Sequence, residues 1–169
     1  MEKEPKQRKI VSSRHLATEG GWQLSELEFG LIVAYNGFSR WMGRCMTAAG
    51  NASLGPLEIL VLHNLTHRER GKRLADVCFM LNIEDAHTVN YAIKKLLKAG
   101  LVEGEKSGKE MLYSPTSEGM ALVKRYRDVR EQCLIDGLNM DGDELRAIAA
   151  TLRRLSGVYD QAARAASSL

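Results

Sequence analysis

The fold is decided by residues 74–115, which read LADVCFMLNIEDAHTVNYAIKKLLKAGLVEGEKSGKEMLYSP. This stretch predicts a short helix over 74–81, a turn over 82–85, a second helix over about 86–99, and short strands at 101–105 and 110–114. Asp85 is a good N-cap for the second helix, because its carboxylate can accept the free N–H groups of the first turn. Gly100 ends that helix, because glycine readily takes the left-handed conformation that follows a helix C-terminus.

The second helix has two unlike faces. Its apolar residues recur at spacings of three and four and predict the buried side: Val89, Ile93, Leu96 and Leu97. The polar and basic residues fall mainly on the other side: His87, Thr88, Asn90, Tyr91, Lys94, Lys95 and Lys98. Because no carboxylate occurs between Asp85 and Glu103, this outer face is cationic and hydrogen-bonding. Such a face suits a groove lined by phosphates, and we expect it to bind double-stranded DNA.

The hairpin is less basic than the helix before it. Lys106, Ser107, Gly108 and Lys109 join its strands, and the Ser-Gly pair suits a tight turn. A two-residue turn at that pair would place Glu105 opposite Glu110, which is mildly unfavourable. With Glu103, the hairpin then holds three glutamates against its two lysines, so it is a poor grip for phosphates.

Apolar helices are expected on both sides of this stretch. Residues 24–49 form a long helix that is apolar on several sides, so it must be buried on more than one side. A second subunit is the simplest source of the extra cover. A helix over 56–66 begins with Pro56 and leads into the basic connector 67–73, which has room for a very short strand and ends in Arg73. Thr116 starts a helix that runs on to Cys133, and DGDE (141–144) has the form of a capping box that opens a last helix.

Composition limits the class of protein. The chain has 169 residues, 44% of them hydrophobic, which is enough for one sizeable domain or for one domain with helical extensions. Its net charge of +3 alone does not identify a nucleic-acid binder. The N-terminus lacks the apolar run of a signal peptide, and no stretch is long and apolar enough to span a membrane. We therefore expect a cytoplasmic location and no membrane partner.

The sequence offers little to catalysis or to metal binding. It contains no Gly-rich phosphate loop, no HExxH and no nucleophile elbow, so we expect no enzymatic activity, no catalytic residues and no cofactor. His63 and His67 lie four apart and would suit a shared metal, but without a third ligand two histidines at a helix end are the simpler interpretation. Cys45, Cys78 and Cys133 are far apart and favour reduced thiols over a disulfide framework, with a thiol redox switch as the alternative.

Short motifs in a fixed order carry a resemblance to a known family. Leu74-Ala75, the helix from Asp85 to Leu97, Gly100-Leu101-Val102, and Thr116-Ser117-Glu118-Gly119 follow one another as in the MarR family of bacterial transcriptional regulators. The local match covers residues 56–119, and with the flanking helices the resemblance extends over about 24–166. Each motif is weak alone; their order and spacing carry the resemblance.

The resemblance implies a mainly α fold with a small β-wing, in which dimerisation helices flank a winged helix-turn-helix domain. It implies a homodimer whose recognition helices enter successive major grooves of an inverted repeat. Many members also sense small lipophilic ligands. Carried onto this chain, the DNA-binding residues are His87, Thr88, Asn90, Tyr91, Lys94 and Lys95 on the helix, Lys106 and Lys109 on the wing, and Arg73 on the connector. Family wings usually carry an Asp-x-Arg element, which this wing lacks.

The chain is thus expected to have four parts. They are a flexible basic N-terminal arm (1–20), a dimerisation helix (21–50), the winged helix-turn-helix domain (51–118) and C-terminal helices that complete the dimer (119–169). The arm is expected to be a solvated, partly mobile terminus, with contact to phosphates or to the partner subunit as the alternative. The acidic wing keeps a second hypothesis open, a winged-helix protein–protein interaction module that does not bind DNA.

Overall fold

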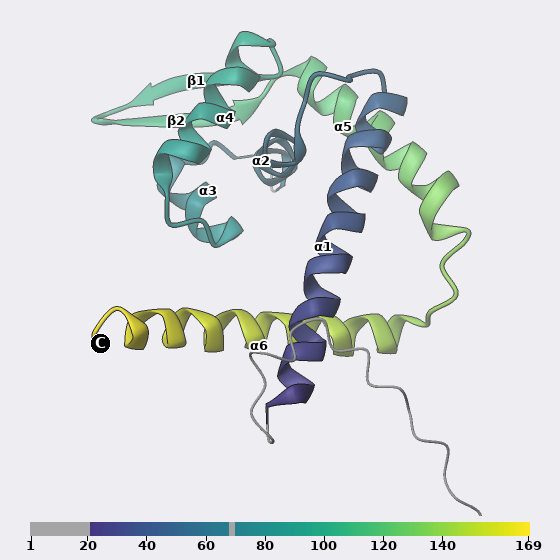
Figure 1. The fold of residues 1–169 in the computed structure, drawn as a ribbon. Helices are drawn as coiled ribbons and strands as arrows, with labels where there is room; N and C mark the ends of the chain where they lie inside the picture. Colours follow the sequence, from purple (N-terminus) through teal and green to yellow (C-terminus); the bar gives the residue numbers. More distant parts are fainter. Residues whose placement is uncertain (1–20, 68–69) are drawn as a thin grey trace, which may run out of the picture. The chain divides into compact units, whose positions relative to one another are not determined.

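A computed structural model describes residues 21–67 and 70–169. The described chain divides into two units, one ending at Arg130 and the other running from Glu131 to Leu169. The expected basic arm at 1–20 lies outside the described residues. The first unit holds helices α1 to α5 and the β1–β2 hairpin, and the second holds helix α6 (Figure 1).

Helices α1 (Trp22–Ala48) and α2 (Pro56–Thr66) begin the first unit. Pro56 occupies the first turn of α2 as expected, where its missing N–H costs nothing. The Glu58 side chain accepts the N–H of Gly55 at 2.7 Å, which satisfies one of the free donors before the helix. Arg125 donates from Nε to the carbonyl of Ala49 at 2.9 Å, just beyond the C-terminus of α1.

Helices α3 (Leu74–Leu81) and α4 (Ala86–Lys98) form the helix-turn-helix. Asn82 takes the left-handed conformation after α3, with φ of 52°. The Asp85 carboxylate accepts the N–H of His87 at 2.9 Å, which confirms the expected N-cap of α4. Gly100 has φ of 70°, which confirms its expected left-handed conformation.

The buried face of α4 differs from the prediction at one position. Val89, Ile93 and Leu96 are fully buried as expected, but Leu97 is 36% exposed at the edge of that face. Ala92 is fully buried in its place. Ala92 fits the same spacings, since it lies three residues after Val89 and four residues before Leu96.

The wing consists of the antiparallel strands β1 (Val102–Ser107) and β2 (Glu110–Pro115). The predicted opposition of Glu105 and Glu110 is wrong: Glu105 pairs with Leu112, and Ser107 pairs with Glu110. The turn lies one residue later than expected, because Gly108 takes φ of 62° at the first of its two central positions. A type II′ turn has its glycine there, whereas the prediction had placed it second.

A backbone bridge extends the hairpin at its root. Lys72 and Tyr113 exchange both backbone hydrogen bonds, at 2.9 and 2.8 Å, which confirms that the connector has strand-like pairing. The buried Lys72 side chain reaches back to the end of α2, where its ammonium donates to the carbonyl of Asn64. A cation is favoured at this position by the helix dipole.

Helix α5 (Ser117–Arg130) packs tightly on the start of the wing. The Thr116 hydroxyl donates to the carbonyl of Gly100 at 2.7 Å and accepts the N–H of Gly119 at 3.1 Å. A Cβ atom at Gly119 would overlap the carbonyl oxygen of Leu101. The Thr-x-x-Gly motif is therefore a close contact between helix and strand. The helix stops at Arg130, short of the predicted Cys133, and a π-helical turn spans Glu131–Ile135.

The core of the first unit joins the C-terminal part of α1 to α2, α4 and α5. Met42, Cys45 and Met46 of α1 are almost completely buried there. The N-terminal part of the same helix is apolar and exposed in the single chain, through Leu24, Leu27, Phe29, Ile32, Val33, Tyr35 and Phe38. One helix thus ends in a core and begins on the surface.

The second unit contains α6 (Gly142–Ala166), which the structure describes along its whole length. The Asp141 carboxylate accepts the N–H groups of Asp143 and Glu144, each at 2.8 Å, and so caps the helix as expected. None of its side chains is buried, and its apolar residues include Leu145, Ile148, Leu152 and Val158. Throughout the described ranges, every helix falls short of the length or hydropathy required to cross a membrane.

Candidate nucleic-acid interface

The outer face of α4 carries most of the predicted site residues. His87, Thr88, Tyr91 and Lys94 are exposed, and Tyr91 is 71% exposed despite its size. Asn90 and Lys95 are half-buried at the sides of this face. We call His87, Tyr91, Lys94 and Lys98 the exposed stripe, because they are all exposed and recur at spacings of three and four.

The start of α4 is held by Asp85. The Thr88 hydroxyl donates to this carboxylate at 2.6 Å, and the His87 N–H donates to it at 2.9 Å. These two bonds, the Thr88 hydroxyl first, lower the pKa of Asp85. The Thr88 hydroxyl therefore donates its hydrogen to the cap residue Asp85, and its oxygen can still accept a hydrogen bond from another group.

Lys95 differs from its neighbour Lys94. Its ammonium lies 3.4 Å from Glu58 Oε1, and the Glu58 side chain is only 12% exposed. The same carboxylate accepts the Gly55 N–H through its other oxygen. Lys95 therefore links α4 to the start of α2, so part of its charge is compensated inside the protein.

The wing presents both signs of charge to solvent. Lys106, Lys109, Glu103, Glu105 and Glu110 are all exposed. Because residues alternate along a strand, Glu103 and Glu105 share one face of the hairpin with Glu110 and Leu112. Lys106 lies on the opposite face, beside Met111, and Lys109 lies in the turn. The acidic face and the lysines are thus separated.

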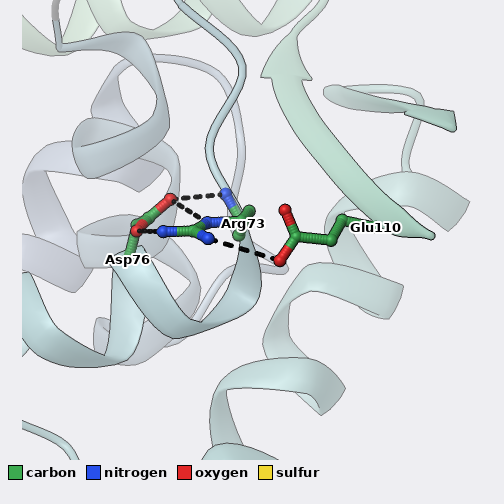
Figure 2. A network of polar contacts seen from close by, with 3 residues as sticks. All are labelled: Arg73, Asp76 and Glu110. Atoms are coloured by element: carbon green, nitrogen blue, oxygen red, sulfur yellow. Dashed lines mark hydrogen bonds and ion pairs between the residues drawn. The ribbon is translucent and has the colours of Figure 1, made fainter. Parts of the chain in front are cut away.

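Arg73 lies between the helix-turn-helix and the wing (Figure 2). Its Nε and Nη2 atoms donate to the two oxygens of Asp76, at 3.0 and 2.9 Å, and its Nη1 atom lies 3.3 Å from Glu110 Oε1. The hydrogen bond from this guanidinium, joined by one from the Arg73 N–H, lowers the pKa of Asp76 to about 2. Both carboxylates, Asp76 first, raise the pKa of Arg73.

A cavity that sequence analysis missed opens on the α1, α2 and α5 side of the unit. Its volume is about 450 Å³, and its lining is mostly apolar: Phe38, Trp41, Met42, Leu60, His63, Val123, Tyr126, Arg127 and Arg130. These residues come from three helices far apart in the chain, so no local sequence pattern could have shown it.

His63 is the unusual group of this cavity. Its ring packs edge-on against that of Tyr126, with ring centres 4.6 Å apart. Its Nε2 atom is buried and has no hydrogen-bond partner among the described residues. Burial, assisted by the positive charge of Arg130, lowers the pKa of His63. Burial also raises the pKa of Tyr126 to about 12. The cavity thus combines a histidine with a buried Nε2 atom and two exposed arginines within a mostly apolar lining.

The metal alternative for His63 and His67 gains no support. Within residues 21–67 and 70–169, His, Cys, Asp and Glu side chains do not gather in groups of three that would suit a metal ion. None of the three cysteines, which all lie in the described ranges, forms a disulfide bond; Cys45 is buried, Cys78 is half-buried and Cys133 is exposed.

Comparison with known proteins agrees with the geometry. Residues 54–119 match a family model described as a winged helix DNA-binding domain. A comparison of the sequence with curated proteins gives no significant match.

Solved structures match over most of the chain. AbfR of Staphylococcus epidermidis has a TM-score of 0.68 at 16% identity, over 82% of this chain and 92% of its own. A mutant MarR from E. coli, complexed with operator DNA, has a TM-score of 0.66 at 15% identity, over 82% and 99%. NMB1585, a MarR family regulator from Neisseria meningitidis, has a TM-score of 0.64 at 18% identity, over 84% and 96%. The chain therefore has the mainly α fold of MarR family regulators, with a winged helix domain of the DNA-binding type at residues 54–119.

Proposed function

We propose that this protein is a homodimeric DNA-binding transcriptional regulator that places α4 in the major groove of an inverted repeat. The observation that carries the proposal is the exposed stripe of α4, which is free of carboxylates and is presented by a winged helix unit. A major groove admits one α-helix, and its phosphate walls favour lysines along the outer side of that helix. The similar MarR from E. coli was crystallised with operator DNA.

Individual residues take different roles in this proposal. Lys94 would neutralise phosphate, because it is exposed on the stripe. Asn90 would read adenine, because its amide matches the donor and acceptor that adenine presents in the major groove. His87, Thr88 and Tyr91 would contact the remaining base edges, with Lys95 beside them. Lys106 and Lys109 would approach the backbone from the wing.

Dimerisation would come from the apolar surfaces outside the winged helix domain. In α1, seven large apolar side chains from Leu24 to Phe38 are exposed in the single chain. In α6, Leu145, Ile148, Leu152 and Val158 are exposed as well. Contiguous apolar surfaces of this kind mark protein–protein contacts. We therefore assign residues 21–50 and 119–169 to the dimer and 51–118 to DNA, with half-sites about 34–36 Å apart.

The cavity between α1, α2 and α5 would hold a small-molecule effector. Its volume of about 450 Å³ falls in the range of ligand sites, and its walls are largely aromatic and aliphatic. Arg127 and Arg130 favour an anionic group, so an aromatic acid is the class that fits best. Trp41 lines the cavity, so fluorescence of a Trp22→Phe variant should change when such a compound binds. An unchanged signal across a panel of aromatic acids would count against this effector class.

The central experiment is selection of DNA from a random duplex library, followed by fluorescence anisotropy of the selected site. We expect an inverted repeat and a steep loss of affinity as salt rises. The double variant Lys94→Ala, Lys95→Ala should weaken binding to selected and random DNA alike. Lys124→Ala is the matched control, because Lys124 is an exposed lysine of α5 outside the proposed interface. If the unaltered protein retained no DNA at about 50 mM salt, the proposal would fail.

A second candidate is a winged-helix protein–protein module, and the exposed glutamates of the wing favour it. Glu103, Glu105 and Glu110 repel phosphate and would suit a basic partner surface. A stable protein partner in a pull-down, lost when these three are changed to glutamine, together with no retention of DNA, would select this candidate over the first.

A further inference from the structure

We propose that Arg73 is a positioning residue, which holds the tip of the wing against the start of α3 and does not itself bind phosphate. This inference rests on the proposed DNA-binding function and deepens it. It departs from the sequence-based expectation that Arg73 is one of the DNA contacts.

The first support is the geometry of the guanidinium. Asp76 accepts two parallel hydrogen bonds from Arg73, at 3.0 and 2.9 Å, and its Oδ2 atom also accepts the Arg73 backbone N–H at 3.1 Å. An arginine fork that pairs with both oxygens of one carboxylate has a fixed plane. The remaining Nη1 atom then points to Glu110 at 3.3 Å (Figure 2). Asp76 thus sets the direction in which Arg73 reaches the wing.

The second support is the position of Glu110 in the hairpin. The backbone bridge between Lys72 and Tyr113 holds the hairpin near its root. Glu110 begins β2, three residues beyond that bridge and next to the Gly108-Lys109 turn. The ion pair with Arg73 is therefore a second attachment nearer the tip. Without it, the tip would be held to the rest of the unit through the root of the hairpin.

The third support is the charge that a DNA backbone would meet. The wing holds Glu103, Glu105 and Glu110 against two lysines. Arg73 contacts Glu110 but also pairs with Asp76, so its one positive charge is shared between two carboxylates. A phosphate that approached Arg73 would also meet Asp76 and Glu110, since both touch the same guanidinium. Repulsion from two carboxylates that share one guanidinium makes Arg73 a poor phosphate contact.

The test is a double-mutant cycle measured by anisotropy on the selected DNA site. Because the pair is about half exposed, at 48% and 57%, the expected effect is modest. Arg73→Ala should weaken binding roughly two- to fivefold in the natural background and less than about twofold in a Glu110→Gln background. The slope of log affinity against log salt should stay unchanged, because no phosphate contact is lost.

A contrary result has a clear form. If Arg73→Ala cost the same in both backgrounds and reduced the salt slope by about one, Arg73 would be a phosphate contact and the inference would be overturned. Arg70→Ala is the matched control: it removes an exposed arginine three positions earlier, and its effect should not depend on the residue at 110.

A second measurement separates this inference from the proposed function. Amide hydrogen exchange near the tip, at residues 107–111, needs no DNA. Exchange there should be faster in Arg73→Ala and Asp76→Asn than in Arg70→Ala, with thermal unfolding confirming that each variant is folded. If exchange were faster in the variants but the protein bound no DNA, the positioning role of Arg73 would stand and the proposed DNA-binding function would be rejected. Unchanged exchange in both variants would reject the positioning role of Arg73.

Discussion

Helix α4 and the wing are both exposed parts of the winged helix unit, and they carry their charge in opposite ways. The exposed stripe of α4 is free of acids, and its opposite face is anchored by Val89, Ile93 and Leu96 in the core. The hairpin carries both signs of charge, with its glutamates on one face and its lysines on the other face and in the turn, and beyond Val102 its first strand buries nothing. Helix α4 is thus anchored in the core and cationic, whereas the wing is held by contacts with residues outside the hairpin, Lys72 and Arg73.

The contrast shows that charges near a nucleic acid must be counted after their internal partners are known. Lys94 and Lys95 are adjacent in sequence, yet Lys95 shares its charge with the buried carboxylate of Glu58. Arg73 looks like a free cation in the sequence, yet two carboxylates occupy it. A sum of formal charges in the sequence therefore overestimates the positive charge that Lys95 and Arg73 can offer to phosphate.

The largest effect is expected where the two regions join. Gly119→Ala would place a Cβ atom on the carbonyl oxygen of Leu101, and backbone cannot move aside as a flexible side chain can. We expect a loss of about 3 kcal/mol in the free energy of unfolding, because the start of β1 and α5 must separate. Urea unfolding followed by circular dichroism would measure it. Gly43→Ala is the control: it meets open space within α1 and should leave stability equal or higher.

The contrast within α4 is the next test. Lys94→Ala should weaken DNA binding roughly tenfold and lower the salt slope by about one, because an exposed lysine on the stripe is lost. Lys95→Ala should cost less, because Glu58 already compensates part of its charge. Anisotropy titrations at several salt concentrations would compare them. Equal losses would mean that Lys95 leaves Glu58 when DNA binds.

The wing itself should matter less than the helix. Lys106→Ala combined with Lys109→Ala should weaken binding about two- to threefold, since glutamates nearby already reduce the local potential. Replacing Glu103 and Glu105 by glutamine should strengthen binding to a similar extent. If the two lysines cost more than Lys94 alone, the wing would be the main contact and the contrast would be reversed.

The smallest expected effect is the pH dependence of stability, which arises from His63 and involves neither α4 nor the wing. Because burial lowers the pKa of His63 in the folded protein, the unfolded chain binds more protons near pH 6, so stability is full above the unfolded pKa of about 6.5 and declines as pH falls below it. The urea midpoint should therefore drop between pH 7.5 and 5.5, and this drop should shrink in His63→Leu. His67→Leu, at an exposed histidine, should keep the full drop.

Much of the winged helix unit could be predicted because its signals are local. Asp85, Gly100 and Pro56 act within one helical turn, and their roles follow from backbone chemistry alone. The periodic apolar positions of α4 identified three of its four fully buried residues, since burial of one helical face depends on spacing.

The misses involve choices that local sequence leaves open. A glycine in a two-residue turn fits the first central position in one turn type and the second in another, so Gly108 permitted two registers. Lys72 is buried because it reaches the end of α2, a contact between separate segments. The partners of Arg73 and Lys95, and the cavity around His63, likewise arise only when segments distant in sequence come together. Spacing along one helix carries no information about them.

The bridge at Lys72 has a mechanical consequence. His63 lines the cavity, and the next residue of α2, Asn64, receives the Lys72 ammonium through its carbonyl oxygen. The backbone of Lys72 is in turn bonded to Tyr113 in the hairpin. The wall of the cavity in α2 is therefore connected to the hairpin through one side chain and one pair of peptide groups, so a substitution at Lys72 would alter both regions at once.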